Sequence, residues 1–189
     1  MPDGKLERLD DVERTCLDAL TRAALDKKSP MRWPTFVTAG LDSGAEARIV
    51  VLRAFDRKGR WVSIWTDGRS AKVSELQADP SVTLLFFDKS RMMQLRARGT
   101  AEILTEGDAW ERAFAAAKSA SLDDYTTKRP PGAPLSEEGI TRELDLASDT
   151  FTLIRVALHQ IDWLSLSRSG HQRALLDWQD GASHSWRVP

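Results

Sequence analysis

The sequence predicts a mainly β protein with flanking helices, folded as an antiparallel β-barrel that is closed or split. Seven or eight apolar segments of strand length follow one another with turn residues between most of them, which favours hairpins and antiparallel pairing. Two or three other segments carry apolar residues at helical spacing. The 189 residues, 41% hydrophobic and 29% charged, have the composition of a globular protein and the length of one domain with extensions. We therefore expect a single domain over residues 1–189.

The first predicted element is an amphipathic helix at about residues 5–27. Apolar side chains recur there every three or four positions, from Leu6 to Ala24, with charged side chains between them. Two prolines then break the helical spacing, and residues 33–40 predict a first strand.

Two further strands are predicted at 46–55 and 61–66. Residues 46–55 are β-branched and apolar over about ten positions, and the turn sequence Asp-Arg-Lys-Gly leads from them into 61–66. Three strands joined by short turns predict an antiparallel meander.

A short helix is predicted at 71–79, with Ser70 as its N-cap. Strands at 81–88 and 91–104 follow it. Apolar and polar residues alternate along 91–104, so one face of that strand should be strongly polar.

A second long helix is predicted to begin near Thr105 and Asp108, where apolar residues again recur at helical spacing. The segment at about 119–138 contains Lys-Arg-Pro-Pro-Gly-Ala-Pro, which fits neither a helix nor a central strand and predicts a Pro-rich loop. The last quarter of the chain returns to strands, predicted at 151–158, 161–168, 171–178 and 185–189.

The composition argues against several classes of protein. Twenty-seven Lys and Arg balance 28 Asp and Glu, so the net charge of −1 gives no overall field that attracts a nucleic acid. No segment approaches the roughly 18 apolar residues that cross a bilayer, and the charged start has no signal-peptide core. Cys16 is the only cysteine, and the three histidines lack the spacing of metal ligands. These features predict a cytoplasmic protein without a metal, a membrane partner or a nucleic-acid partner.

Cationic residues form the clearest chemical pattern. Arg48 and Arg53 flank four apolar residues, and Arg69, Ser70 and Lys72 surround a predicted helix start, where free backbone N–H groups favour an anion. This arrangement outlines a phosphate site. The alternative is that these cations are solvated and that Ser70 only caps the helix.

Four separated segments resemble the FMN-binding pyridoxamine 5'-phosphate oxidase family in order and spacing. They are R-I-V-V-L-R, then W-T-D-G-R-S-A-K, then Gln94, and finally Trp163 and Arg173, which lie ten residues apart. The resemblance runs from about residue 33 to residue 189 and implies a single FMN-binding split-barrel domain. The residues that it implies for FMN, with Arg69 considered beside them, are Arg48, Ile49, Val50, Val51, Leu52, Arg53, Trp65, Thr66, Arg69, Ser70, Lys72, Gln94, Trp163 and Arg173.

FMN combines a dianionic phosphate, a polyol and a flat ring, so its site needs cations, polar partners and an apolar wall. The candidates for these roles are Arg48, Arg69, Ser70 and Lys72 for the phosphate, Thr66 and Gln94 for the polyol or ring edge, and Val50 and Trp163 for the ring face. Arg53 or Arg173 is expected near the pyrimidine end, where a cation stabilises the reduced flavin.

The departures from the family pattern concern phosphate and substrate contacts. Ala71 replaces a family arginine, so a phosphate contact is missing unless Arg69 supplies it. Ser169 replaces a second arginine that meets the substrate, whereas His171 keeps the family histidine; His171 and Arg53 are the expected substrate residues. The Tyr, Arg and Ser of the family's substrate-phosphate clamp have no clear equivalents. The pattern therefore favours FMN binding over vitamin B6 oxidation.

The resemblance implies an FMN-dependent oxidoreductase that acts on a small molecule, as a homodimer with FMN at the subunit interface. The departures from the family pattern predict poor activity on pyridoxamine 5'-phosphate itself. A non-catalytic protein that binds or stores FMN or haem remains the alternative, and the sequence does not separate the two. A nucleic-acid-binding barrel is the least favoured reading because the charge is balanced.

Overall fold

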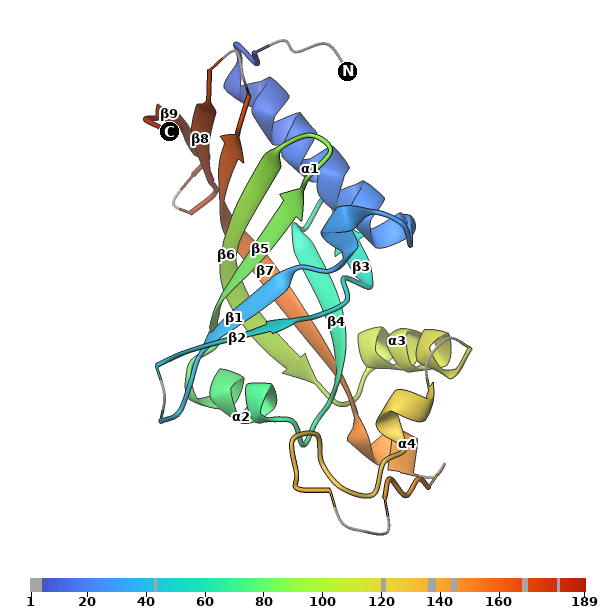
Figure 1. The fold of residues 1–189 in the computed structure, drawn as a ribbon. Coiled ribbons are helices and arrows are strands. Elements are labelled where there is room, and N and C mark those ends of the chain that lie inside the picture. The colour runs from blue at the N-terminus through green and yellow to red at the C-terminus, as the bar shows by residue number, and fades with distance from the viewer. Residues whose placement is uncertain are drawn as a thin grey trace.

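The computed structural model describes residues 5–42, 44–119, 122–135, 139–143, 146–167, 170–179 and 181–189 (Figure 1). Its helical elements are α1 (Leu9–Leu25), η1 (Pro30–Arg32), α2 (Ala71–Ala78), α3 (Asp108–Lys118), η2 (Leu122–Tyr125) and α4 (Leu146–Thr150). Its strands are β1 (Thr35–Ala39), β2 (Ala45–Ile49), β3 (Ala54–Asp56), β4 (Trp61–Asp67), β5 (Ser81–Asp88), β6 (Met93–Leu104), β7 (Phe151–Ser165), β8 (Gln172–Asp177) and β9 (Ser183–Arg187).

The strands form one antiparallel, nine-stranded sheet in the order β2-β1-β5-β6-β7-β4-β3, with β8 on β7 and β9 on β8. The strands at the two ends of this path, β2 and β3, are consecutive in the chain, so the sheet curls round on itself. Side chains from β1, β4, β5, β6, β7 and β8 fill its main core. The predicted mainly β architecture with flanking helices is confirmed.

The N-terminal helix covers one end of the sheet, as its amphipathic pattern predicts. Val12, Cys16 and Leu20 are fully buried on the face of α1 that packs against β3, β8 and β9. Trp178 Nε1 donates a hydrogen bond to Glu13 Oε1 at 3.0 Å, which ties α1 to the C-terminal strands. The helix begins at Leu9, four residues later than expected.

The strand predicted at 46–55 is wrong in one respect, because the structure divides it into β2 and β3. Val50 N still donates to Pro34 O beside β1, whereas Arg53 N donates to Ser63 O of β4. The segment therefore changes its partner strand within four residues. Instead of continuing a meander, β2 and β3 lie at the two ends of the strand order, and the link between them closes the sheet. A continuous apolar run cannot reveal such a change, because nothing in the run marks the point where the partner strand changes.

The two strands predicted at 151–158 and 161–168 are instead one strand, β7, of 15 residues. No glycine or proline separates the two halves, and the irregularity appears as a shift in register against β6, between Arg98 and Gly99. A Cβ on Gly99 would lie 2.2 Å from Ala157 O, so β6 needs glycine where the strands approach closely. His159 is the extra residue of this bulge.

A second, smaller core lies at the other end of the sheet. It joins the apolar stripe of α3, including Trp110 and Phe114, to Tyr125 and to Phe151 at the start of β7. In the described part of the predicted Pro-rich loop, η2 is followed by an isolated bridge between Thr127 and Arg142. The five-residue helix α4 was not predicted.

Candidate functional site

The turn from β4 into α2 brings together the start of the predicted phosphate site. Gly68 N donates to Thr150 O at 2.7 Å, and a Cβ on Gly68 would lie 2.6 Å from Thr152 Oγ1, so the turn packs tightly. Ser70 is the N-cap residue of α2, as predicted, but its side chain makes no capping bond. Its hydroxyl donates to Asp67 O at 2.8 Å and lies 3.2 Å from Thr66 Oγ1.

Lys72 completes this cluster. Its ammonium donates to Thr66 Oγ1 and Ser70 Oγ, both at 3.0 Å, from a half-buried position. Burial lowers the pKa of Lys72, and the nearby charge of Arg48 lowers it further. An ammonium and two hydroxyls at one helix start form a donor set that suits a phosphate, which would also relieve the repulsion between the two cations.

Arg48 approaches the cluster from β2 but is already paired. Its Nη2 donates to Glu75 Oε2 of α2 at 2.8 Å, and its Nη1 contacts Thr38 Oγ1. Glu75 is buried and accepts a second hydrogen bond from Thr38 at 2.5 Å. The pair holds Arg48 against α2. Glu75 could not be recognised from the sequence because its partners, Arg48 and Thr38, are far away in the chain.

The guanidinium of Arg69 is held by other groups. It donates to Asp67 Oδ2 at 2.6 Å, to Thr127 O at 2.7 Å and to Lys128 O at 3.0 Å. Arg69 therefore fastens the Pro-rich loop to the turn before α2. This geometry disfavours Arg69 as the replacement for the arginine missing at Ala71.

Arg53 belongs to an aromatic wall next to the second core. Its Cζ lies 4.4 Å from the centre of the Trp65 ring, and Trp65 in turn meets Phe151 edge-on. Tyr125 packs on Phe151 at 5.1 Å, and burial raises its pKa to about 12 although the charge of Arg53 acts in the opposite direction. Tyr125, the only tyrosine in the chain, is not among the site residues expected from the sequence.

The two residues expected on the ring face both lie in the core of this chain. Val50 is 8% exposed and Trp163 is 3% exposed. Residues along 48–53 alternate, so that Ile49, at 60% exposure, faces outward whereas Leu52 is fully buried. Trp163 is opposite Leu95 and on the core side of β7, so neither side chain offers an open ring face within one chain.

A second polar group lies on the outer face of β6, β7 and β8. Gln94, Leu164 and Arg173 form one cross-strand row, and Arg96 is paired with Asp162 in the next row. Asp162 accepts hydrogen bonds from both arginines. Burial alone would raise the pKa of Asp162, but the hydrogen bonds from Arg173 and Arg96 hold it below its ordinary value of 3.8.

Asp162 is not among the site residues expected from the sequence. Its only signal is an acidic residue between the apolar residues of a predicted strand. His171 is exposed just before β8, and Ser169 lies outside the described residues.

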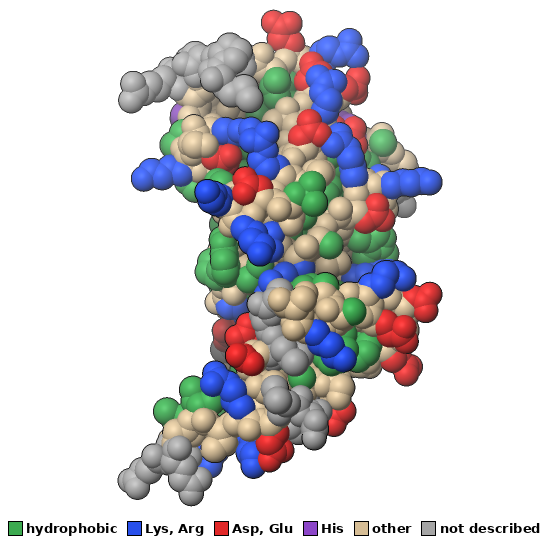
Figure 2. Space-filling model, turned by 90° about the vertical axis from the view of Figure 1, so that its right-hand side faces the viewer, with side chains coloured by type: hydrophobic (Ala, Val, Ile, Leu, Met, Phe, Trp, Pro, Cys, Tyr) green, Lys and Arg blue, Asp and Glu red, His purple; other side chains and the backbone are tan. Residues whose placement is uncertain are grey.

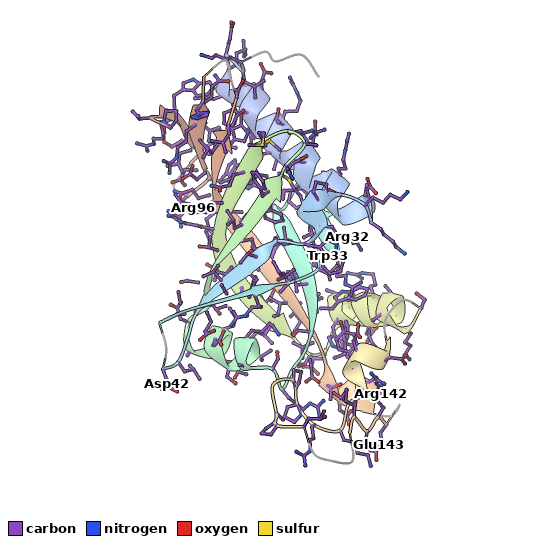
Figure 3. All side chains as sticks on the ribbon, in the orientation of Figure 1. Arg32, Trp33, Asp42, Arg96, Arg142 and Glu143 are labelled. Atoms are coloured by element: carbon purple, nitrogen blue, oxygen red, sulfur yellow. The ribbon has the colours of Figure 1, made fainter. Side chains whose placement is uncertain are left out.

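Within one chain, these two polar groups lie far apart. Thr66 is paired with Thr152, whereas Gln94 is paired with Leu164, twelve positions further along β7. That is roughly 40 Å of strand at about 3.3 Å per residue. Figure 1 shows α2 and β8 toward opposite ends of the molecule, and Figure 3 places Arg96 in the half of the sheet that carries β8.

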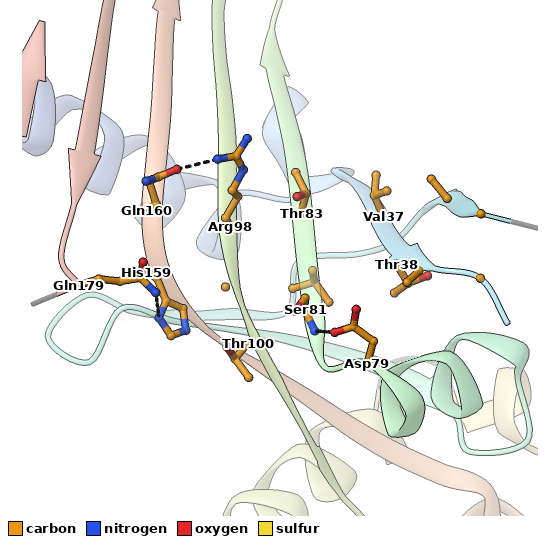
Figure 4. Close-up of a pocket in the computed structure, with 16 residues that line it drawn as sticks. Val37, Thr38, Asp79, Ser81, Thr83, Arg98, Thr100, His159, Gln160 and Gln179 are labelled. Carbon is orange, nitrogen blue, oxygen red and sulfur yellow. Dashed lines mark hydrogen bonds between the residues drawn. The ribbon is translucent and has the colours of Figure 1, made fainter. Parts of the chain in front are cut away.

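A cavity of about 680 Å³ occupies the outer face between the two groups (Figure 4). At one end it includes Thr38, which contacts Arg48. At the other end Arg98 Nη1 donates to Gln160 Oε1 at 2.9 Å, in the row next to Arg96 and Asp162. The bulged His159 lines the same cavity, with its Nδ1 3.4 Å from Gln179 Nε2.

Residues 31–144 match the family model described as pyridoxamine 5'-phosphate oxidase. The chain belongs to the pyridoxamine 5'-phosphate oxidase family. The matched range contains the whole phosphate-site cluster and Gln94 but ends before Asp162, Trp163 and Arg173.

Curated relatives in this family are pyridoxine/pyridoxamine 5'-phosphate oxidases. The protein of Caulobacter vibrioides is 41% identical over 75 residues, which cover 40% of this chain and 33% of the relative. That of Azorhizobium caulinodans is 37% identical over 109 residues, which cover 58% of this chain and 50% of the relative. The chain thus spans between a third and a half of these relatives' length.

Solved structures show that the oxidase family's split-barrel fold extends over nearly the whole chain. An FMN-binding, pyridoxamine 5'-phosphate oxidase-related protein from Nostoc punctiforme has a TM-score of 0.71 at 19% identity, covering 93% of this chain and 97% of its own. PhzG from Burkholderia lata, solved with tetrahydrophenazine-1-carboxylic acid, has a TM-score of 0.76 at 15% identity, covering 99% and 98%.

Two features are absent from the described residues. Within them, no helix is long and apolar enough to cross a membrane. No three His, Cys, Asp or Glu side chains among them gather closely enough to hold a metal ion.

Proposed function

We propose that this chain is an FMN-binding flavoprotein and an FMN-dependent oxidoreductase that acts on a small molecule. The observation that carries the proposal is the half-buried Lys72, which faces the hydroxyls of Thr66 and Ser70 and is repelled by Arg48. This donor set fits a phosphate dianion. Bound FMN would supply hydride or electron transfer.

The residues of the chain bind and orient the cofactor in this proposal. Lys72, Ser70 and Thr66 hold the phosphate, and Arg48 adds a second positive charge while Glu75 keeps it in place. Arg53, held over Trp65, lies beside the buried Tyr125 and forms one wall for a substrate. Gln94 and Arg173 meet the ring edge.

We further propose a homodimer with FMN between the subunits. The separation of the two polar groups supports it, because Lys72 and Arg173 of one chain lie at opposite ends of β7. A second copy lying over the outer face could place its own Gln94 and Arg173 near the first copy's Lys72. Exposed Ile49 and Phe87 on that face would then become buried.

The substrate is proposed to differ from pyridoxamine 5'-phosphate. Ser169 stands where the family uses an arginine, and the cations of the Pro-rich loop that could replace it are engaged. Lys128 forms an ion pair with Glu143, and Arg129 donates to Pro134 O at 2.8 Å. A site that loses its charged partners loses most discrimination for a phosphorylated substrate.

Absorbance spectroscopy of the purified protein tests the proposal. We expect a flavin spectrum, rapid bleaching with NADPH or NADH and recovery in air. A protein that stays colourless after FMN is added contradicts the flavin assignment, whereas bound FMN that no reductant bleaches supports the non-catalytic alternative. A nucleic-acid role gains no support from the face in Figure 2, where basic and acidic side chains are mixed.

Steady-state assays of the FMN-loaded protein test the substrate proposal. Pyridoxamine and pyridoxine 5'-phosphates should give kcat/KM values below about 10⁴ M⁻¹s⁻¹, the lower end of the ordinary enzyme range. Values at or above that level would show that the chain is an efficient oxidase of these compounds.

A further inference from the structure

Asp162 joins two arginines from different strands on the outer face of the sheet. Arg173 of β8 donates from Nε to Asp162 Oδ1 at 2.9 Å and from Nη2 to Oδ2 at 2.7 Å. Arg96 of β6 donates from Nη2 to the same Oδ2 at 2.5 Å. The Asp162 side chain is 11% exposed, whereas the arginines are 34% and 38% exposed. The carboxylate is thus covered and the guanidinium groups remain accessible.

The two contacts from Arg173 fix the plane of its guanidinium. Two parallel N–H···O bonds to one carboxylate hold an arginine more rigidly than a single contact does. Nε and Nη2 face Asp162, so Nη1 on the opposite side takes no part in the pair. Gln94 lies in the same cross-strand row as Arg173, with Leu164 between them.

Asp162 also controls the local charge. Arg96 and Arg173 meet at one carboxylate, so without it two like charges would lie side by side and move apart. The ordinary role of such a cluster is to fasten neighbouring strands, and surface ion pairs of that kind contribute little to stability. The cluster here includes a residue that the proposed function places at the cofactor.

We propose that Asp162 is a positioning residue for the flavin, acting through Arg173. It holds the guanidinium so that the Nη1 side is presented, next to Gln94, to the pyrimidine edge of FMN. The inference rests on the proposed function, and it adds a residue that lies outside the family-matched range of 31–144.

A double-mutant cycle on FMN affinity tests this role. Apoprotein is titrated with FMN and the quenching of flavin fluorescence gives Kd for the wild type, Asp162→Asn, Arg173→Ala and the double variant. We expect Asp162→Asn to raise Kd about tenfold in the wild type, within the usual coupling between contacting residues, and less than about twofold in Arg173→Ala. Fastening of β6 to β7 through Arg96 would instead give the same rise in Kd with and without Arg173.

Asp177→Asn is the matched control. Asp177 lies on the same face, one row from Asp162, and accepts hydrogen bonds from Gln160 Nε2 and from Gln179 N, both at 2.9 Å. Its substitution removes one carboxylate from the face but none from Arg173. Its Kd for FMN should stay within about twofold of the wild-type value.

Asp162→Glu provides a second variant that keeps the charge. The extra methylene displaces the guanidinium but leaves it paired, so we expect Kd to rise severalfold, again only when Arg173 is present. An unchanged Kd in Asp162→Glu and Asp162→Asn overturns the inference, as does an equal rise with and without Arg173. If the wild type itself takes up no FMN, the proposed function fails. If the wild type binds FMN but the Asp162 variants bind it equally tightly, only the inference about Asp162 fails.

Discussion

Lys72 and Arg69 lie two residues apart at the start of α2, yet their environments differ. The ammonium of Lys72 donates to two neutral hydroxyls, and burial and Arg48 lower its pKa more than the charges of Glu75 and Asp67 raise it. Arg69 is instead paired directly with Asp67 and bonded to two loop carbonyls. An anion entering this end of the sheet would therefore gain more from Lys72. Charge alone, which is the same for both, does not show this difference.

Lys72→Ala should weaken FMN binding by about 1.5–3 kcal/mol, the usual range for a hydrogen bond to a charged group. Fluorescence titration of the apoprotein measures the change in Kd. Lys89→Ala, at an exposed position after β5, is the matched control and should leave Kd unchanged. A Kd for Lys72→Ala equal to that of the control would identify Lys72 as a solvated surface residue.

The lowered pKa of Lys72 predicts how FMN affinity depends on pH. Burial and Arg48 place this pKa below 10.5, so the folded apoprotein loses the proton before the unfolded chain does. The contribution of Lys72 to the free energy of unfolding therefore rises with pH between the lowered value and 10.5. In the proposed site the ammonium binds the FMN phosphate, so the Kd for FMN should increase with pH over the same window.

Titrations between about pH 7 and about pH 10 measure this dependence, and Lys72→Arg is the control because a guanidinium stays charged throughout. The variant should show a flatter profile than the wild type. Parallel profiles would mean that another group titrates.

Among the secondary-structure elements, those bounded by turn residues were predicted closely. The helix expected at 71–79 forms as α2, and the strand expected at 81–88 forms as β5 with the same bounds. The errors occur where the choice of partner strand determines the outcome. Residues 46–55 change partner between β1 and β4, and 151–165 stay on β6 through a bulge. Local sequence does not encode either event.

In the candidate site, too, the contacts between residues close in sequence were predicted and those between distant segments were not. Thr66, Ser70 and Lys72 lie within seven residues, and the sequence pattern brought them together correctly. Tyr125 beside Arg53 and Asp162 beside Arg96 arise from contacts between segments at least 66 residues apart. Such contacts depend on the register of the sheet, which becomes visible only in three dimensions.

Arg69 connects two elements, the turn before α2 and the Pro-rich loop. Arg69→Ala removes the hydrogen bonds to Thr127 O and Lys128 O and should loosen the bridge at Thr127. The amide of Lys128, which donates to Thr141 O, should then exchange its hydrogen on the order of tenfold faster, as the loss of about one charged hydrogen bond implies.

Hydrogen exchange measured by NMR tests the effect of Arg69→Ala, and Arg98→Ala is the control because the Arg98 guanidinium donates to Gln160 of β7 rather than to the Pro-rich loop. The control should leave the loop amides unchanged. Equal exchange rates in the wild type and Arg69→Ala would show that the loop holds its position without Arg69.

For the whole molecule, the arrangement of the site depends on whether one chain or two chains surround the cofactor. The cavity on the outer face extends from Thr38, next to Arg48, toward Arg98 and Gln160. Its lining includes Arg98 and Gln160, which lie one row from Arg96 and Asp162 on β6 and β7. A second copy over this face would complete the proposed site, and we expect light scattering to give the mass of a dimer.

Complementation between two defective chains tests this arrangement. If FMN needs Lys72 from one subunit and Arg173 from the other, a heterodimer of Lys72→Ala and Arg173→Ala chains has one site with both residues intact and one with neither. Purified through two different affinity tags, it should bind FMN with wild-type affinity at about one of its two sites.

A heterodimer of Lys72→Ala and Arg48→Ala chains is the control, since both changes affect the same group and leave no site intact. If neither heterodimer recovers FMN binding, or if a monomer still binds FMN, a single chain forms the site. The two polar groups of that chain are separated by roughly 40 Å of β7, so a different set of residues would then have to bind FMN.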